Sequence, residues 1–103
     1  MPLRQILPGR SQEHAALVGE LLAEWNNPTS GSAEPIIVEE KDRSQRLIHV
    51  YVVWSKWSHI DRVERSEIIM EAAERRLSQP DLLNITIAMG LTPDEATRLG
   101  LRF

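Results

Sequence analysis

Arg46-Leu47-Ile48-His49-Val50-Tyr51-Val52-Val53-Trp54 is the stretch that decides the fold of this 103-residue chain. It is dominated by β-branched and aromatic residues, which is typical of a strand. The even-numbered side chains are all apolar and are expected to face a core: Ile48, Val50, Val52 and Trp54. The odd-numbered side chains are mixed and are expected to face a less dry environment: Leu47, His49, Tyr51 and Val53. Such alternation predicts a sheet covered by helices on one face and partly open on the other.

A partner strand precedes this stretch. Residues 35–40 (PIIVEE) are short and β-branched, and their proline stands at the start, where a strand tolerates it. The charged residues 41–45 between the two strands have the length of a hairpin connection, although they lack an Asn-Gly turn.

Two long helices are predicted, over residues 11–26 and about 61–77. Ser11 is the expected N-cap of the first, and Asn26-Asn27-Pro28 ends it. Asp61 and Glu64 resemble a capping box at the start of the second. Ile68 falls on the polar face of this second helix, and the opposite face is expected to pack against the core. The first helix is expected to bury Val18, Leu21, Leu22 and Trp25, and the second Val63, Ser66, Ile69, Met70, Ala73 and Leu77.

The C-terminal third contains one ambiguous element and one clear one. Residues 82–89 (LLNITIAM) fit a third strand by alternation and β-branched content, but also a helical face that ends at Gly90. We expect a strand. Thr92-Pro93-Asp94-Glu95 predicts a capping box that opens a helix of about seven residues, which Gly100 ends.

The predicted fold class is therefore α+β, a small two-layer sandwich of order α-β-β-α-β-α. A three-stranded sheet carries the two long helices on one face. Residues 1–103 form a single domain, with an N-terminal arm at 1–10 and a mobile loop at 26–34. At the level of element order this is similar to type II KH and BolA-like domains. KH domains grip nucleic acid through a Gly-x-x-Gly loop, and this sequence contains none.

Bulk composition narrows the function classes. The chain has no cysteine, which excludes thiolate catalysis and cysteine-ligated zinc. The net charge is −3 and both halves carry mixed charges, which counts against nucleic-acid binding driven by bulk charge. A secretory signal needs an apolar run of roughly 7–15 residues, and the N-terminus holds only short apolar pieces. We expect a cytoplasmic protein that does not enter the membrane.

The sequence does not predict an enzyme, a cofactor site or a metal site. The histidines are scattered and form no metal signature. Ser58, His59 and Asp61 contain the residue types of a hydrolytic triad, but residues this close in a helix-entry turn point in different directions. Adjacent Glu39 and Glu40 alternate across a strand and make no acid/base pair.

An aromatic and basic cluster is the most informative feature for function. It surrounds Trp57 and follows the mixed face of the central strand. Such clusters pack in a core, anchor a protein partner or stack nucleic-acid bases. Our first hypothesis is a non-catalytic protein–protein interaction module, which self-associates through the open sheet face or a sheet edge. The alternative is a nucleic-acid-binding module around Trp57. The candidate interaction surface comprises His49, Tyr51, Val53, Lys56, Trp57, Arg62, Arg65 and Ile68.

Overall fold

The computed structural model describes residues 12–29 and 33–103. The predicted arm at 1–10, the predicted cap Ser11 and residues 30–32 of the predicted loop lie outside the described residues. The elements follow in the order α1 (Gln12–Asn26), β1 (Ile36–Lys41), β2 (Leu47–Val53), the 3₁₀ helix η1 (Ser55–His59), α2 (Arg62–Arg76), α3 (Gln79–Leu82), β3 (Ile87–Leu91) and α4 (Pro93–Leu99).

The three strands form one sheet in the order β1-β2-β3. β1 and β2 pair antiparallel as a hairpin, and β2 and β3 pair parallel. Parallel pairing requires a crossover connection, which α2 supplies. Asp42 makes the hairpin turn, since its Oδ1 accepts from the backbone N–H groups of Ser44 at 2.8 Å and Arg46 at 3.0 Å. The N–H of Arg46, followed by that of Ser44, holds the pKa of Asp42 below its usual range.

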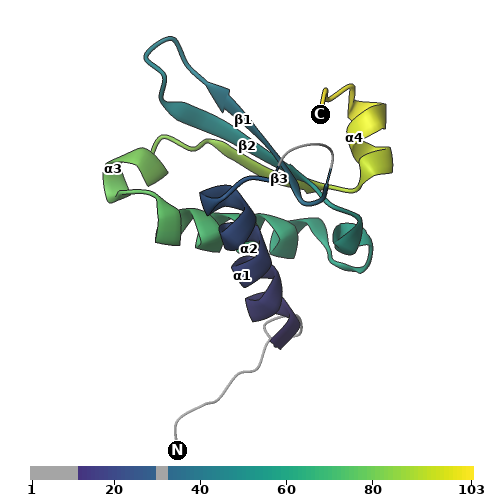
Figure 1. Ribbon diagram of the computed structural model, residues 1–103. Coiled ribbons are helices and arrows are strands. Elements are labelled where there is room, and N and C mark those ends of the chain that lie inside the picture. The colour runs from purple at the N-terminus through teal and green to yellow at the C-terminus, as the bar shows by residue number, and fades with distance from the viewer. Residues whose placement is uncertain (1–11, 30–32) are drawn as a thin grey trace, which may run out of the picture.

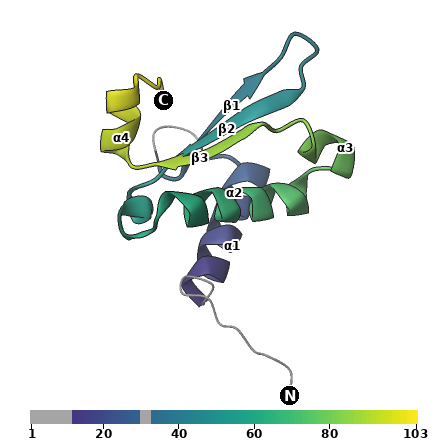
Figure 2. The same ribbon diagram turned by 180° about the vertical axis from the view of Figure 1, so that it is seen from behind.

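Helices α1 and α2 lie on one face of the sheet, and α4 lies on the other (Figures 1 and 2). α2 packs against both α1 and β3. The predicted α+β class and the predicted two long helices on one face are therefore confirmed. The structure adds two short helices, η1 and α3, between the predicted elements.

The alternation predicted for the central strand holds for three of its four apolar positions. Val50, Val52 and Trp54 belong to the core beneath the helices. Ile48 does not, because the register shifts next to Glu40 and Lys41. Leu47 packs against the core in its place. A bulge adds one residue to a strand and so exchanges the two faces beyond it.

The buried face of α2 is rotated from the predicted one. It consists of residues at spacings of three and four: Arg65, Ile68, Ile69, Ala72 and Ala73. Ile68 was predicted on the polar face and is fully buried, whereas Val63 was predicted in the core and is 71% exposed. Tertiary packing causes this rotation of the buried face, because α2 is covered by the sheet on one side and by α1 on another.

The ambiguous stretch at 82–89 divides between two elements. α3 ends at Leu82, and β3 begins only at Ile87. The expected third strand is present but starts later and extends through Gly90 to Leu91. Gly90 is therefore a strand residue and not a helix cap.

The predicted caps of α2 and α4 are largely confirmed. Asp61 Oδ1 accepts from the Glu64 N–H at 2.9 Å. Thr92 and Glu95 form the full capping box of α4, which ends at Gly100 in the left-handed region with φ of 82°. Glycine adopts this conformation without the steric cost that other residues meet.

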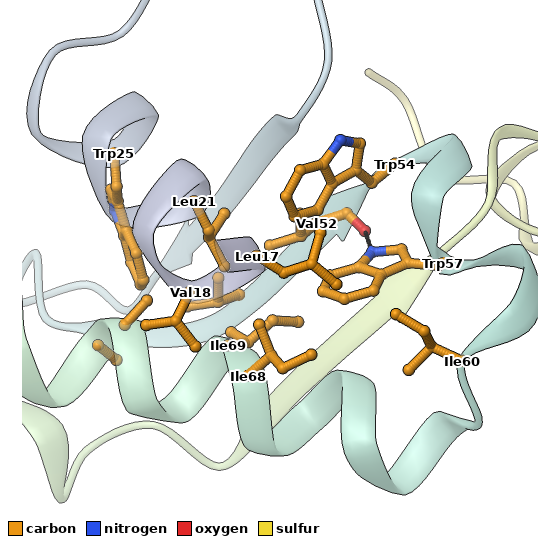
Figure 3. Packing of buried hydrophobic residues seen from close by; sticks show 13 residues of the cluster. Leu17, Val18, Leu21, Trp25, Val52, Trp54, Trp57, Ile60, Ile68 and Ile69 are labelled. Atoms are coloured by element: carbon orange, nitrogen blue, oxygen red, sulfur yellow. Dashed lines mark hydrogen bonds between the residues drawn. The ribbon is translucent and has the colours of Figure 1, made fainter. Parts of the chain in front are cut away.

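Trp57 is the largest fully buried side chain and joins η1 to the sheet. Its indole Nε1 donates to the Val52 carbonyl at 2.9 Å, and its ring meets that of Trp54 edge-on at 5.1 Å (Figure 3). β3 approaches so closely that a Cβ on Gly90 would lie 2.9 Å from both Trp57 and the Arg65 Cβ. Only glycine fits at this point of the strand.

We expect Gly90→Ala to destabilise the protein, because neither the buried indole nor the first carbon of Arg65 can move aside. Overpacking of this kind costs about 1–3 kcal/mol of unfolding free energy. Gly19→Ala is the matched control, since a Cβ there meets nothing within 4 Å and alanine favours helix α1 by about 0.5–1 kcal/mol. Urea unfolding measures both, and a Gly90→Ala variant as stable as the wild type would contradict the packing described.

Candidate interaction surface

Three rows of side chains cross the sheet face that points away from α1 and α2. Strand register defines them, because paired residues share a face. The rows are Ile36–Val53–Leu91, Val38–Tyr51–Met89 and Glu40–His49–Ile87.

Helix α4 covers the end of this face that holds the first row, and the partly buried Tyr51 and Met89 of the second row pack against the cluster beneath it. Val53 and Leu91 form a second buried cluster with Ala96 of α4. Val53, predicted on the open face, has the predicted orientation but is fully buried. The burial of Val53 depends on how α4 packs against the sheet, which the alternation along the strand does not predict.

The other two rows remain partly exposed and contain a polar cluster. Glu40 Oε1 lies 2.7 Å from His49 Nδ1 and accepts from the Tyr51 hydroxyl at 3.4 Å. Burial, followed by the charge of Glu40, raises the pKa of Tyr51. Its hydroxyl therefore stays protonated at neutral pH and can donate to Glu40.

A groove of about 420 Å³ continues this surface between β3 and α4. Its apolar lining residues are Met89, Leu91 and Leu99, of which Leu99 is 60% exposed. Its charged lining residues are Arg62, Arg98 and Glu95, and Arg62 lies 4.0 Å from Glu95. The uncovered face thus has Glu40 at one end and the mixed charges of this groove, Arg98 among them, at the other.

Besides Val53, three more of the predicted surface residues are buried. Trp57, Ile68 and Arg65 are 0%, 0% and 5% exposed. Arg65 donates to three backbone carbonyls, those of Ile60 at 2.7 Å, Trp57 at 2.8 Å and Gly90 at 3.2 Å. The Arg65 guanidinium therefore connects buried elements, and of the predicted basic residues Lys56 and Arg62 remain on the surface.

Arg65 also pairs with Glu95 of α4 across 2.8 Å. The Thr92 N–H, followed by Arg65, holds the pKa of Glu95 below its usual range. One guanidinium consequently connects α2, η1, β3 and the cap of α4. Every buried side-chain N or O atom in the described residues has a hydrogen-bond partner.

The outer edge of β3 is closed by side chains of α2. Ser66 Oγ donates to the Ala88 carbonyl at 2.7 Å, and Arg65 donates to that of Gly90. The outer edge of β1 is protected differently, by Pro35 before it and by a bulge and charged residues at its end. Proline, charges and bulges are the devices that hinder strand addition.

Lys56 and Arg62 are the predicted basic residues that do lie on the surface. Lys56 Nζ is 2.9 Å from Glu20, and Arg62 approaches Glu95 to 4.0 Å. Neither has an exposed aromatic neighbour from the predicted cluster, because Trp54 and Trp57 are both buried.

Three further features of the described residues bear on a metal site, a ligand site and a membrane span. No group of three or more His, Asp or Glu side chains in residues 12–29 and 33–103 is arranged to hold a metal ion. A cleft of about 260 Å³ lies beside β1, but its Trp25 Nε1 already donates to Glu39 at 2.9 Å, and Arg76 lies over the Trp25 ring. Within these same residues, no helix is long and apolar enough to cross a membrane.

Comparison of the chain with protein-family models, with curated proteins and with solved structures finds no match. The similarity to KH and BolA-like domains therefore stays at the level of element order, and the argument for function comes from the surface itself.

We expect Arg65→Gln to be strongly destabilising, because it removes hydrogen bonds from buried carbonyls and removes the cation that lies 2.8 Å from Glu95. Breaking a buried ion pair on one side costs about 3–5 kcal/mol. Arg62→Gln is the matched control and should stay within about 0.5 kcal/mol of the wild type, since that side chain is 75% exposed. Equal stability of the two variants in urea would show that the buried network carries no stability.

Proposed function

We propose that the protein is a non-catalytic interaction module that self-associates through the uncovered rows of its sheet. The observation that carries this is the sheet face opposite α1 and α2, on which α4 buries Val53 and Leu91 and leaves the rows through Tyr51 and His49 partly exposed. Sheets of this size ordinarily bury one face and solvate the other with polar residues. Here the second face is rich in apolar and aromatic side chains: Val38, Tyr51, Ile87 and Met89.

A second copy of the chain can occupy this surface by symmetry and by charge. In a two-fold dimer the same patch of both copies is in contact, and the two patches run in opposite directions. The Glu40 end of one copy then meets the Arg98 end of the other. Complementary charges at the rim fix orientation and reject partners that lack them.

The sheet face is favoured over the sheet edges as the contact. The β3 edge has its carbonyls occupied by Ser66 and Arg65, and the β1 edge begins at a proline and ends in a bulge. Face-to-face packing needs no unpaired backbone group.

The nucleic-acid alternative receives less support. Stacking of bases requires exposed aromatic rings, and Trp57 is buried. Lys56 and Arg62 remain exposed, but each has a carboxylate partner within 4.0 Å.

Analytical ultracentrifugation over a range of concentrations tests the proposal. Tyr51→Glu places a charge in the centre of the patch and should weaken dimerisation at least about tenfold, which corresponds to 1.4 kcal/mol. Val63→Glu adds the same charge at an exposed site on α2 and should leave dimerisation unchanged.

Charge exchange gives a sharper second test. Glu40→Arg and Arg98→Glu should each weaken the dimer, and their combination should restore it. A wild type that stays monomeric at millimolar concentration would overturn self-association, and failure of the double variant would overturn the orientation.

A further inference from the structure

His14 lies in the interface between α1 and α2, away from the proposed contact surface. It is 7% exposed. Its Nδ1 is 3.2 Å from Glu64 Oε2, and its Nε2 is 2.7 Å from Glu71 Oε2. Both ring nitrogens of a buried histidine therefore face carboxylates, one from the first turn of α2 and one from two turns further along the helix.

This arrangement requires one more proton than neutral histidine supplies. A neutral imidazole has one N–H donor and one nitrogen lone pair. The lone pair would meet the lone pairs of a carboxylate oxygen at hydrogen-bond distance, which is repulsive. The cluster satisfies both contacts only when the ring carries a proton on each nitrogen, or when one carboxylate is protonated.

Burial and hydrogen bonding act on His14 in opposite directions. Burial is the largest single effect and lowers its pKa. The hydrogen bonds and charges of Glu71 and Glu64 together outweigh it, so that the pKa of His14 lies above its ordinary value of 6.5.

The other charged groups near His14 lie on α1, η1 and α2. Arg75 Nη2 approaches the other oxygen of Glu71 to 3.7 Å, so this carboxylate is shared. On α1 itself, Glu13 Oε2 is 2.7 Å from His59 Nε2 of η1, but these side chains are 52% and 59% exposed. Two more charged contacts involve α1: Lys56 Nζ of η1 is 2.9 Å from Glu20, and Arg76 of α2 donates to Asn26 Oδ1 at 2.7 Å.

We propose that His14, Glu64 and Glu71 form a proton-operated latch that holds the N-terminal half of α1 on α2. With the proton bound, the latch joins the helices through two charge-assisted hydrogen bonds. When the proton is released, one of these contacts becomes repulsive in a partly buried interface. This half of α1 then keeps the apolar contacts of Leu17 and Val18 and the exposed Glu13–His59 contact, and it opens more often.

The direction with pH follows from linkage. A histidine whose pKa is raised by folding contributes stability that is fully present below its unfolded pKa of 6.5. This contribution is lost as the pH rises through the folded pKa. The latch is therefore closed at mildly acidic pH and loosens toward alkaline pH.

Amide hydrogen exchange of the full chain between pH 6 and pH 9, corrected for the intrinsic exchange rate, tests the proposal. Amides of residues 14–20 in α1 should lose protection as the pH rises, while those of residues 68–73 in α2 keep theirs. An equal loss in both helices would show a change in global stability only and would overturn a latch.

Variants separate the buried cluster from the exposed one. His14→Gln should remove the pH dependence of α1 protection, and His59→Gln, which alters the exposed pair, should leave it in place. Because His14→Gln can weaken folding, the titration of the His14 ring by NMR in the wild type provides an independent readout. A pKa at or below 6.5 would overturn the proposal, as would an unchanged pH dependence in His14→Gln.

Discussion

The hydrogen bonds and the ion pair of the buried Arg65 guanidinium are the interactions on which the remaining structure depends. The guanidinium reaches the carbonyls of Ile60, Trp57 and Gly90 and the carboxylate of Glu95. A cation in this position is costly to desolvate, and only a complete set of acceptors compensates for it. The close approach of β3 at Gly90 places one of these carbonyls within reach. The geometry of one strand, one 3₁₀ turn and two helices is thereby fixed around a single side chain.

This constraint also shapes the surface. Because Arg65 and Ser66 turn toward β3, they occupy its outer carbonyls and close one edge of the sheet. Because Glu95 joins Arg65 and caps α4 at the same time, α4 is held over one end of the opposite face. Because α4 lies at that end, the rows around Tyr51 remain uncovered. The proposed contact surface is thus a consequence of the buried ion pair.

Charge has three different roles in this molecule. Arg65 and Glu95 are internal and structural, and His14 with its two carboxylates lies between helices, where protonation changes the sign of a contact. Glu40 and Arg98 border the uncovered face, where they would set the orientation of a partner. The sequence shows only residue types, and it does not distinguish these roles, because each depends on how far the side chain is removed from water.

Local signals in the sequence determined the elements that need no distant partner. The helix 12–26, the capping box at Thr92, the cap at Asp61 and the alternating strand at 50–54 follow from periodicity, from hydrogen bonds within a few residues and from backbone preference. Tertiary packing alone decided the burial of Arg65, Trp57 and Ile68, the exchange of Leu47 for Ile48 at the bulge, and the pairing of His14 with α2. The physical reason is distance along the chain. His14 lies 50 residues from Glu64, and Arg65 lies 30 residues from Glu95, so no local pattern records their contact.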